Sequence, residues 1–152
     1  MTNSYARFGA FEAPKYIAWS QKNRSQLIVI PPSRIDNMRM EMRSADPSCN
    51  PYLALALILN AGADGIERRL MLRNPTEVNF YKAPVALLDN LDALPNSLSE
   101  AIDIAENSDF VRKYVPRAAL NRFVSEKREE YMEYLQADNK QYYETEAYFM
   151  NI

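Results

Sequence analysis

The helix that begins at residue 51 constrains the fold of this chain more than any other segment. Asn50 and Pro51 are residue types that favour the N-cap and the first position of a helix. The following stretch LALALIL (53–59) is apolar on every side. A helix with no polar face is stable when protein covers it all round, so we expect its first half to be buried. We predict this helix over about 51–72.

Three short segments ahead of the helix have the composition of β-strands. KYIAWS (15–20) and QLIVI (26–30) are rich in aromatic and β-branched residues. MRMEMR (38–43) alternates methionine with charged residues, which is typical of a strand with two unlike faces. We therefore predict short antiparallel strands over about 13–44. Three short strands make a thin sheet, so this sheet and the apolar helix together indicate part of a larger domain.

The remainder of the chain is predicted to be helical, apart from an irregular, proline-containing connection over 74–96. Ser97 and Glu100 have the spacing of a capping box, which opens a helix. Strands followed only by helices indicate the α+β class. Helical spacing of apolar residues predicts the later helices over about 98–107, 109–115 and 117–145.

The composition excludes several classes of function. A net charge of −2 argues against sequence-independent nucleic-acid binding and against attachment to an anionic membrane. The chain has no histidine, so it cannot supply a histidine base or metal ligand. It also lacks a glycine-rich phosphate loop, so nucleotide chemistry would have to use arginine and carboxylate groups. The single Cys49 fits a reducing compartment, and no apolar run approaches the roughly 20 residues that span a bilayer, so we expect a cytoplasmic protein.

The charged face of the 38–43 strand has two interpretations. Arg39, Glu41 and Arg43 occupy alternate positions, so their side chains share one face. The simpler interpretation is a solvated face with ordinary ion pairs, and the pattern alone favours it. The alternative is an anion site in which two guanidinium groups bind phosphate or carboxylate. The carboxylate between them would then bind a hard cation such as Mg²⁺.

Two further segments carry side chains that could take part in chemistry. NRS (23–25) places Arg24 at the start of a strand, where an arginine is usually a surface residue. FGAFEAPKY (8–16) holds Glu12 between glycine and proline residues, which favours a mobile loop. A loop glutamate is usually only solvated, and the alternative is a flap that carries a general base.

In their order along the chain, these motifs resemble the C-terminal catalytic part of type I glutamine synthetase. The motifs are NSY, EAP, NRS, the R-x-E-x-R strand and DPS-x-NPYLA, and the resemblance is densest over 3–67. It implies an oligomeric ligase that joins ammonia to glutamate with ATP, through γ-glutamyl phosphate and with two Mg²⁺ or Mn²⁺ ions. The family's other metal ligands, several glutamates and a histidine, lie upstream of the matching region. We therefore expect a C-terminal portion of such an enzyme, over 1–152, that is inactive by itself.

The resemblance implies a role for each charged residue of these motifs. Glu41 would bind the metal ion near the transferring phosphate, and Arg39 would lie beside the ATP phosphates. Arg24 would contact ATP and stabilise the transferred phosphoryl group. Arg43 and Arg7 would bind the glutamate substrate.

The chain also departs from the family pattern. The resemblance implies that Glu12 lies on a flap, where it would close the site and accept a proton from ammonium. In this chain that flap is one residue shorter than the commonest family form. Val29 replaces an arginine that contacts ATP in the family, and either Arg34 compensates or the activity is altered. Tyr81 in NFY corresponds to a tyrosine that is adenylylated in some members, although a packed loop tyrosine is the simpler interpretation.

Two alternatives to glutamine synthesis stay open. Val29 and the short flap would also fit a glutamine-synthetase-like ligase that joins another amine to the γ-carboxyl of glutamate. A non-catalytic module would instead use the aromatic last helix and the exposed sheet edge to bind intact subunits.

Overall fold

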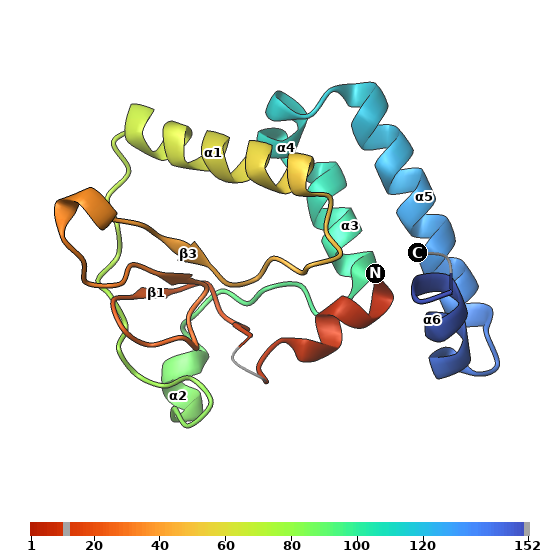
Figure 1. Ribbon diagram of the computed structural model, residues 1–152, viewed down its shortest axis with the longest axis horizontal. Helices are drawn as coiled ribbons and strands as arrows, with labels where there is room; N and C mark the ends of the chain where they lie inside the picture. The colour runs from red at the N-terminus through yellow and green to blue at the C-terminus, as the bar shows by residue number, and fades with distance from the viewer. Residues whose placement is uncertain (11–12, 151–152) are drawn as a thin grey trace. The chain divides into compact units, whose positions relative to one another are not determined.

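The computed structural model describes residues 1–10 and 13–150. The chain forms two compact units. Figure 1 shows the helices and strands of both. The helical unit comprises Met1–Ala6, Ser48–Leu70 and Pro95–Ile152, and the strand unit comprises Arg7–Pro47 and Met71–Leu94. Short strands precede the long helices along the chain, which confirms the predicted α+β class.

The strand unit contains a small sheet with strands in the order β1 (Trp19–Ser20), β2 (Ile28–Val29) and β3 (Glu41–Met42). β2 and β3 are antiparallel, as predicted, and Val29 pairs with Glu41. β1 and β2 are parallel, so the prediction of antiparallel strands is wrong for this pair. The physical reason is that residues 21–27 fold into a turn-rich loop rather than a hairpin, so the chain enters β2 in the direction of β1.

Three further helical segments are only three to six residues long, and the first of them belongs almost wholly to the helical unit. They are η1 (Thr2–Arg7), η2 (Ile35–Asn37) and α2 (Val85–Leu88). α2 lies in the connection that was predicted to be irregular. Pro84 takes its N-cap position, where a missing N–H costs a helix nothing.

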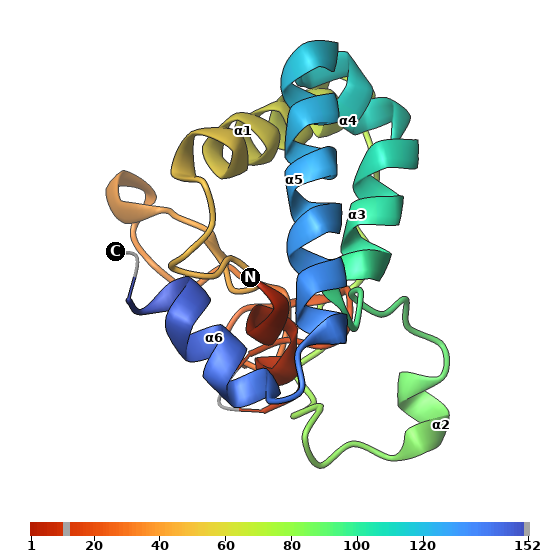
Figure 2. The same ribbon diagram turned by 90° about the vertical axis from the view of Figure 1, so that its right-hand side faces the viewer.

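The helical unit packs around a small aliphatic core. Its elements are α1 (Pro51–Glu67), α3 (Leu98–Asn107), α4 (Asp109–Tyr114), α5 (Arg117–Gln136) and α6 (Lys140–Tyr148). α3 and α5 run side by side, as Figure 2 shows. The buried residues at the centre of this core are Leu98, Ile102, Val115, Leu120 and Val124.

The predicted helix caps are confirmed. The Asn50 side chain accepts hydrogen bonds from the backbone N–H groups of Tyr52 and Leu53, at 3.0 and 3.2 Å. The Ser97 hydroxyl accepts one from the N–H of Glu100 at 3.2 Å. The Glu100 carboxylate accepts in turn from the N–H of Asn96, one residue before the cap, at 2.8 Å.

The last helix, predicted to be continuous over 117–145, is divided into α5 and α6. Asn139 caps α6 by accepting a hydrogen bond from the N–H of Tyr142 at 3.0 Å. The Lys140 ammonium closes the end of α5 by donating hydrogen bonds to backbone carbonyls. These acceptors, 2.6–2.8 Å away, belong to Tyr134, Leu135 and Ala137.

The prediction of a buried first half for α1 is wrong for the described chain, because none of its residues is buried. Leu53 and Leu57 pack partly against the core of the helical unit. Leu55 and Leu59 are exposed on the opposite side of the helix. The sequence pattern shows how apolar a helix is, but it does not show which covering surfaces the same chain provides.

α1 also ends earlier than the predicted residue 72. Arg69 adopts the left-handed conformation, with φ of +50°. Its N–H donates to the carbonyl of Ile66 at 3.1 Å, and the N–H of Leu70 donates to the carbonyl of Gly65 at 2.9 Å. These two bonds form a Schellman motif, which usually places glycine where this chain has Arg69. None of the described helices is long and apolar enough to cross a membrane.

Candidate functional site

The charged residues of the 38–43 segment, in which β3 spans Glu41–Met42, form a face of ion pairs centred on Glu41. One carboxylate oxygen of Glu41 lies 3.1 Å from the Arg39 guanidinium, and the other lies 3.8 Å from that of Arg43. The Glu41 side chain is partly exposed, at 29%. Two cations share one anion, so the face keeps a net positive charge at neutral pH. It can therefore attract an anionic ligand and still offer a carboxylate oxygen.

Arg43 connects this face to the NRS turn. Its Nε donates a hydrogen bond to the backbone carbonyl of Arg24 at 3.0 Å. The Arg43 side chain is only 19% exposed, so its contacts with Glu41 and Arg24 are shielded from water more than those of Arg39, which is 58% exposed. The structure thus brings together three residues that the sequence places on two separate segments.

The NRS turn is held by side chains that bind backbone groups. Gln26 is fully buried, and its amide donates to the carbonyls of Thr76 and Val78 at 2.7 and 2.8 Å. The buried Ser25 hydroxyl accepts a hydrogen bond from the N–H of Phe80 at 3.0 Å. These bonds fix the turn against the chain segment that follows Pro75, and so they fix the backbone that carries Arg24.

Glu77 provides a second support for the same turn. Its carboxylate accepts hydrogen bonds from the backbone N–H groups of Gln21 and Lys22, at 2.6 and 3.3 Å. Its backbone carbonyl accepts one from the Asn23 side chain at 3.2 Å. This role of Glu77 could not be predicted, because no local sequence pattern connects Glu77 to a turn so far upstream.

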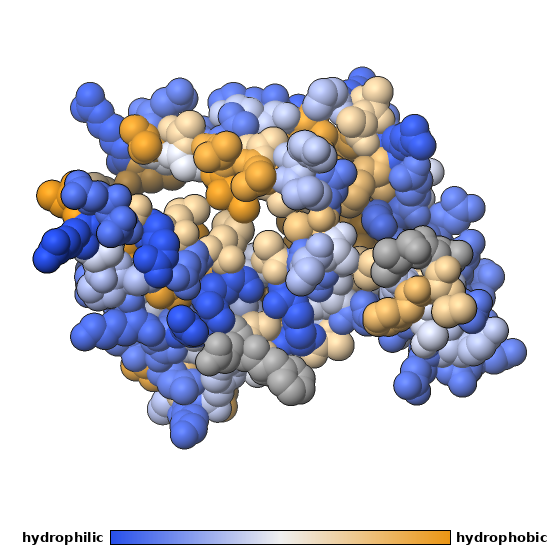
Figure 3. Space-filling model, viewed as in Figure 1, coloured by the Kyte–Doolittle hydropathy of each residue, from blue (hydrophilic) through white to orange (hydrophobic). Residues whose placement is uncertain are grey.

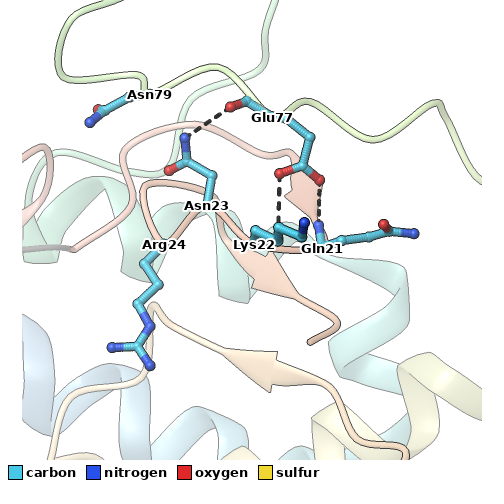
Figure 4. A pocket seen from close by; sticks show the side chains of 6 residues that line it. All are labelled: Gln21, Lys22, Asn23, Arg24, Glu77 and Asn79. Atoms are coloured by element: carbon cyan, nitrogen blue, oxygen red, sulfur yellow. Dashed lines mark hydrogen bonds between the residues drawn. The ribbon is translucent and has the colours of Figure 1, made fainter. Parts of the chain in front are cut away.

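A pocket of about 750 Å³ opens beside the turn, and Figure 4 shows the residues that line it. The Glu77 carboxylate points to the backbone of Gln21 and Lys22, and the Arg24 side chain points away from that carboxylate. Lys22 and Arg24 give the pocket two cationic groups, which suits an anionic ligand. Its lining comprises Gln21, Lys22, Asn23, Arg24, Glu77 and Asn79.

Arg7 lies beside the segment that follows β3. Its Nη2 donates a hydrogen bond to the carbonyl of Ser44, and its Nε lies 3.7 Å from a carboxylate oxygen of Asp46. The guanidinium also stacks over the Phe8 ring, 5.2 Å from the ring centroid. The strand unit therefore gathers most of the predicted site around β3, namely Arg7, Arg24, Arg39, Glu41 and Arg43.

The other predicted residues lie elsewhere. Glu12 is outside the described residues. Arg34 is exposed at the N-cap of η2, and its side chain does not cap that helix. The Tyr81 hydroxyl donates to the carbonyl of Ala13 at 3.1 Å, and the residue is 41% exposed.

Val29, at the position where the family resemblance implies an arginine, is 3% exposed and pairs directly with Glu41. Paired residues of neighbouring strands present their side chains on the same face of the sheet. Val29 lies beside Glu41 but has no charge, so the ion pairs of Glu41 are those with Arg39 and Arg43.

Glu41 fits one position of a hard-metal site and no more. Mg²⁺ and Mn²⁺ prefer several oxygen ligands, and one carboxylate supplies two at most. In residues 1–10 and 13–150, no three His, Cys, Asp or Glu side chains are grouped so that they could hold a metal ion. The described residues therefore do not form a complete metal site.

Comparison with known proteins identifies the family. The model of the family "Glutamine synthetase, catalytic domain" matches residues 1–148. The chain belongs to this family. The matched region contains every predicted site residue, from Arg7 to Tyr81. The resemblance drawn from the sequence motifs is therefore confirmed at the level of the family.

Glutamine synthetases from several organisms are similar to this chain. It is 40% identical over 137 residues to the glutamine synthetase of Methanosarcina mazei, and equally so to that of Thermus thermophilus; each match covers 88% of this chain. For Staphylococcus aureus glutamine synthetase the identity is 40% over 134 residues. A solved structure of a GmaS/ADP complex superimposes with a TM-score of 0.74 and 27% identity over 93% of this chain.

The chain spans less than a third of these glutamine synthetase family members. It covers 31% of the Methanosarcina and Thermus proteins and 29% of the Staphylococcus protein. The chain of the GmaS/ADP complex is also covered to 31%. About two thirds of each protein therefore lies outside the region that this chain matches.

Proposed function

We propose that this chain supplies part of the active site of a glutamine synthetase, an ATP-dependent ligase that forms glutamine from glutamate and ammonia. Membership of the family and the gathering of Arg24, Glu41 and Arg43 in one unit support this proposal. The observation that carries it is the hydrogen bond from Arg43 to the Arg24 backbone. It joins Arg24, to which the family resemblance gives the ATP phosphates, to Arg43, to which it gives the glutamate substrate.

The arginines would bind and orient the anionic substrates. Arg43 and Arg7 would hold the glutamate carboxylate, because guanidinium groups bind carboxylates in a planar, bidentate manner. Arg24 and Arg39 would neutralise the phosphate oxygens of ATP, whose negative charge otherwise repels an attacking carboxylate. Arg24 faces an open pocket with Lys22, which is suitable for a polyanion.

Glu41 would be one ligand of a Mg²⁺ or Mn²⁺ ion. Such an ion, when bound, would polarise the transferring phosphate. The ion pairs of Glu41 with Arg39 and Arg43 would hold its carboxylate in place before the metal arrives. The remaining ligands would come from the part of the enzyme outside the matched region. Glu12 would close the site and accept a proton from ammonium.

The assembled enzyme would be a homo-oligomer, as the family resemblance implies, and cytoplasmic, as the single cysteine and the short apolar runs indicate. The isolated chain would be inactive. The test is to incubate the purified chain with glutamate, ATP, Mg²⁺ and ammonia. We expect no glutamine above the background without protein. Glutamine formation by the chain alone would contradict the proposal that its metal site is incomplete.

A second candidate is a ligase that joins an amine other than ammonia to glutamate. Val29 motivates it, because an apolar side chain is buried opposite Glu41 where the family pattern has a charge. The full enzyme should then use a small primary amine more efficiently than ammonia. A higher kcat/KM with ammonia would rule this candidate out.

A further inference from the structure

α1 has two apolar faces on opposite sides of the helix. Leu53 and Leu57 lie on the inner face and pack against the core of the helical unit. Tyr52, Leu55 and Leu59 follow one another at helical spacing on the other side, as does Ile66 further along. At 3.6 residues per turn, the two sets are about half a turn apart.

The outer face is exposed over the whole length of the helix. Tyr52 is 84% exposed, Leu55 58%, Leu59 70% and Ile66 80%. Figure 3 shows hydrophobic residues gathered on the surface over α1. A contiguous apolar patch of this kind is uncommon on a free protein surface and usually marks a contact with another protein surface.

The charge pattern of α1 defines the chemistry of the surface that would cover it. No Asp, Glu, Lys or Arg occurs from Pro51 to Ala63, so the first three turns offer nothing to a charged partner. Gly62 lies on the same outer face, and a Cβ built there meets no atom within 4 Å. The backbone at Gly62 is therefore open to close packing by an apolar partner.

We infer that the outer face of α1 is the docking surface for the remainder of a glutamine synthetase catalytic chain. Two observations select this occupant. The face has the composition of a protein core, with no charged residue over its first three turns. The family members with which this chain aligns carry about two thirds of their length outside the matched region, which is ample to provide an apolar covering layer.

The inference rests on the family membership and not on the proposed reaction. It also accounts for the difference between the predicted burial of the first half of α1 and the absence of buried α1 residues in the described chain. The helix would be covered all round, with its inner face supplied by its own unit and its outer face by the remainder of the catalytic chain.

The test uses the 152-residue chain and the Methanosarcina glutamine synthetase without its aligned segment, expressed together from two reading frames. We expect the two polypeptides to co-purify, and the remainder to be more soluble with the chain than without it. Leu59→Glu should lower the co-purified amount at least about tenfold, because a buried, unpaired carboxylate opposes docking. The matched control is Met132→Glu on α5, a residue that is 53% exposed, and it should leave co-purification unchanged.

Two checks decide what the result means. Leu59 is exposed, so circular dichroism should show that Leu59→Glu leaves the folding of the isolated chain intact. In a Cys49→Ser background, Leu59→Cys should react with a maleimide at least about tenfold more slowly in the complex than in the isolated chain, because a covered thiol is less accessible.

Three outcomes would overturn the inference. The first is that the remainder stays insoluble with the chain, or that it is soluble and the chain purifies without it. The second is that Leu59→Glu has no more effect than Met132→Glu. The third is that the chain alone forms a dimer that Leu59→Glu dissociates, because a second copy would then cover the face.

Discussion

Arg43 and Arg24 are joined by a hydrogen bond from the Arg43 guanidinium to the backbone carbonyl of Arg24, at 3.0 Å. The same guanidinium pairs with Glu41. One side chain therefore fixes the spacing between the charged strand and the NRS turn. Because this arginine is 19% exposed, we expect its contacts to contribute more to stability than ordinary surface ion pairs.

Substitution of the two arginines of the charged face should have unequal effects. Arg43→Ala should lower the free energy of unfolding by about 1–2 kcal/mol, because it removes a charge-assisted hydrogen bond from a partly buried position. Arg39→Ala should lower it by less than about 0.5 kcal/mol, because Arg39 is more than half exposed. Urea denaturation of the isolated chain measures both, and equal effects would show that Arg43 is not a structural link.

Gln26→Met should be more damaging than its similar side-chain volume suggests. The substitution leaves the carbonyls of Thr76 and Val78 without their buried donor, so we expect a loss of about 2 kcal/mol or more in the free energy of unfolding. Gln21→Met, at an exposed position of the same turn, is the matched control. If both variants unfold at the same urea concentration, Gln26 does not hold the turn.

Arg69→Gly should stabilise the chain by about 0.5–1 kcal/mol, because a non-glycine residue is disfavoured where its Cβ crowds the backbone. Arg69 has a φ of +50°. Arg68→Gly is the matched control, since Arg68 has a φ of −81° and donates to Asp64 at 3.0 Å. The control should destabilise the helix end, and thermal melting distinguishes the two. A loss of stability in Arg69→Gly would contradict the assignment of a strained C-cap.

Glu130 should make the stability of the helical unit depend on pH. Burial raises the pKa of its carboxyl, but hydrogen bonds from Lys127 and Tyr148, at 2.5 and 2.6 Å, outweigh burial and lower the pKa below its ordinary value. A lowered folded-state pKa means that this stabilisation is present above the unfolded-state pKa and is lost as the pH falls through the folded-state pKa.

The measurement is the melting temperature from about pH 7 down to about pH 3, a range that spans the titration of ordinary carboxyl groups. Glu130→Gln should reduce the acid-induced fall in melting temperature, because a neutral amide does not titrate. Glu126→Gln is the control, because Glu126 pairs with Arg122 on an exposed part of α5. An unchanged acid slope in Glu130→Gln would show that other carboxylates cause the pH dependence.

Local features of the fold could be predicted from the sequence. Asn50 and Ser97 cap their helices through backbone groups two or three residues away, so the signal and its partner lie in the same short segment. The alternation of residues 38–43 likewise indicated that Arg39, Glu41 and Arg43 lie together, and Glu41 forms ion pairs with both arginines. In each case the interacting residues lie within a few positions of one another along the chain.

Features that depend on distant segments could not be predicted in the same way. The parallel pairing of β1 with β2 depends on a turn that Gln26 and Glu77 hold against a segment far downstream in the sequence. The left-handed conformation of Arg69 could not be predicted, because the sequence has arginine and not glycine at this position after the end of α1. The exposed face of α1 was missed because an apolar pattern does not identify what covers it.

The most direct test of the central claim is a hybrid in which this chain replaces the aligned segment of the Methanosarcina glutamine synthetase. ATP-dependent glutamine formation is measured for the hybrid, for its Glu41→Ala variant and for a Glu126→Ala control. We expect the hybrid and the control to form glutamine, and Glu41→Ala to lower the rate by about a hundredfold or more, because a metal ligand is lost. A Glu41→Ala hybrid as active as the unsubstituted one would contradict the proposed role of Glu41.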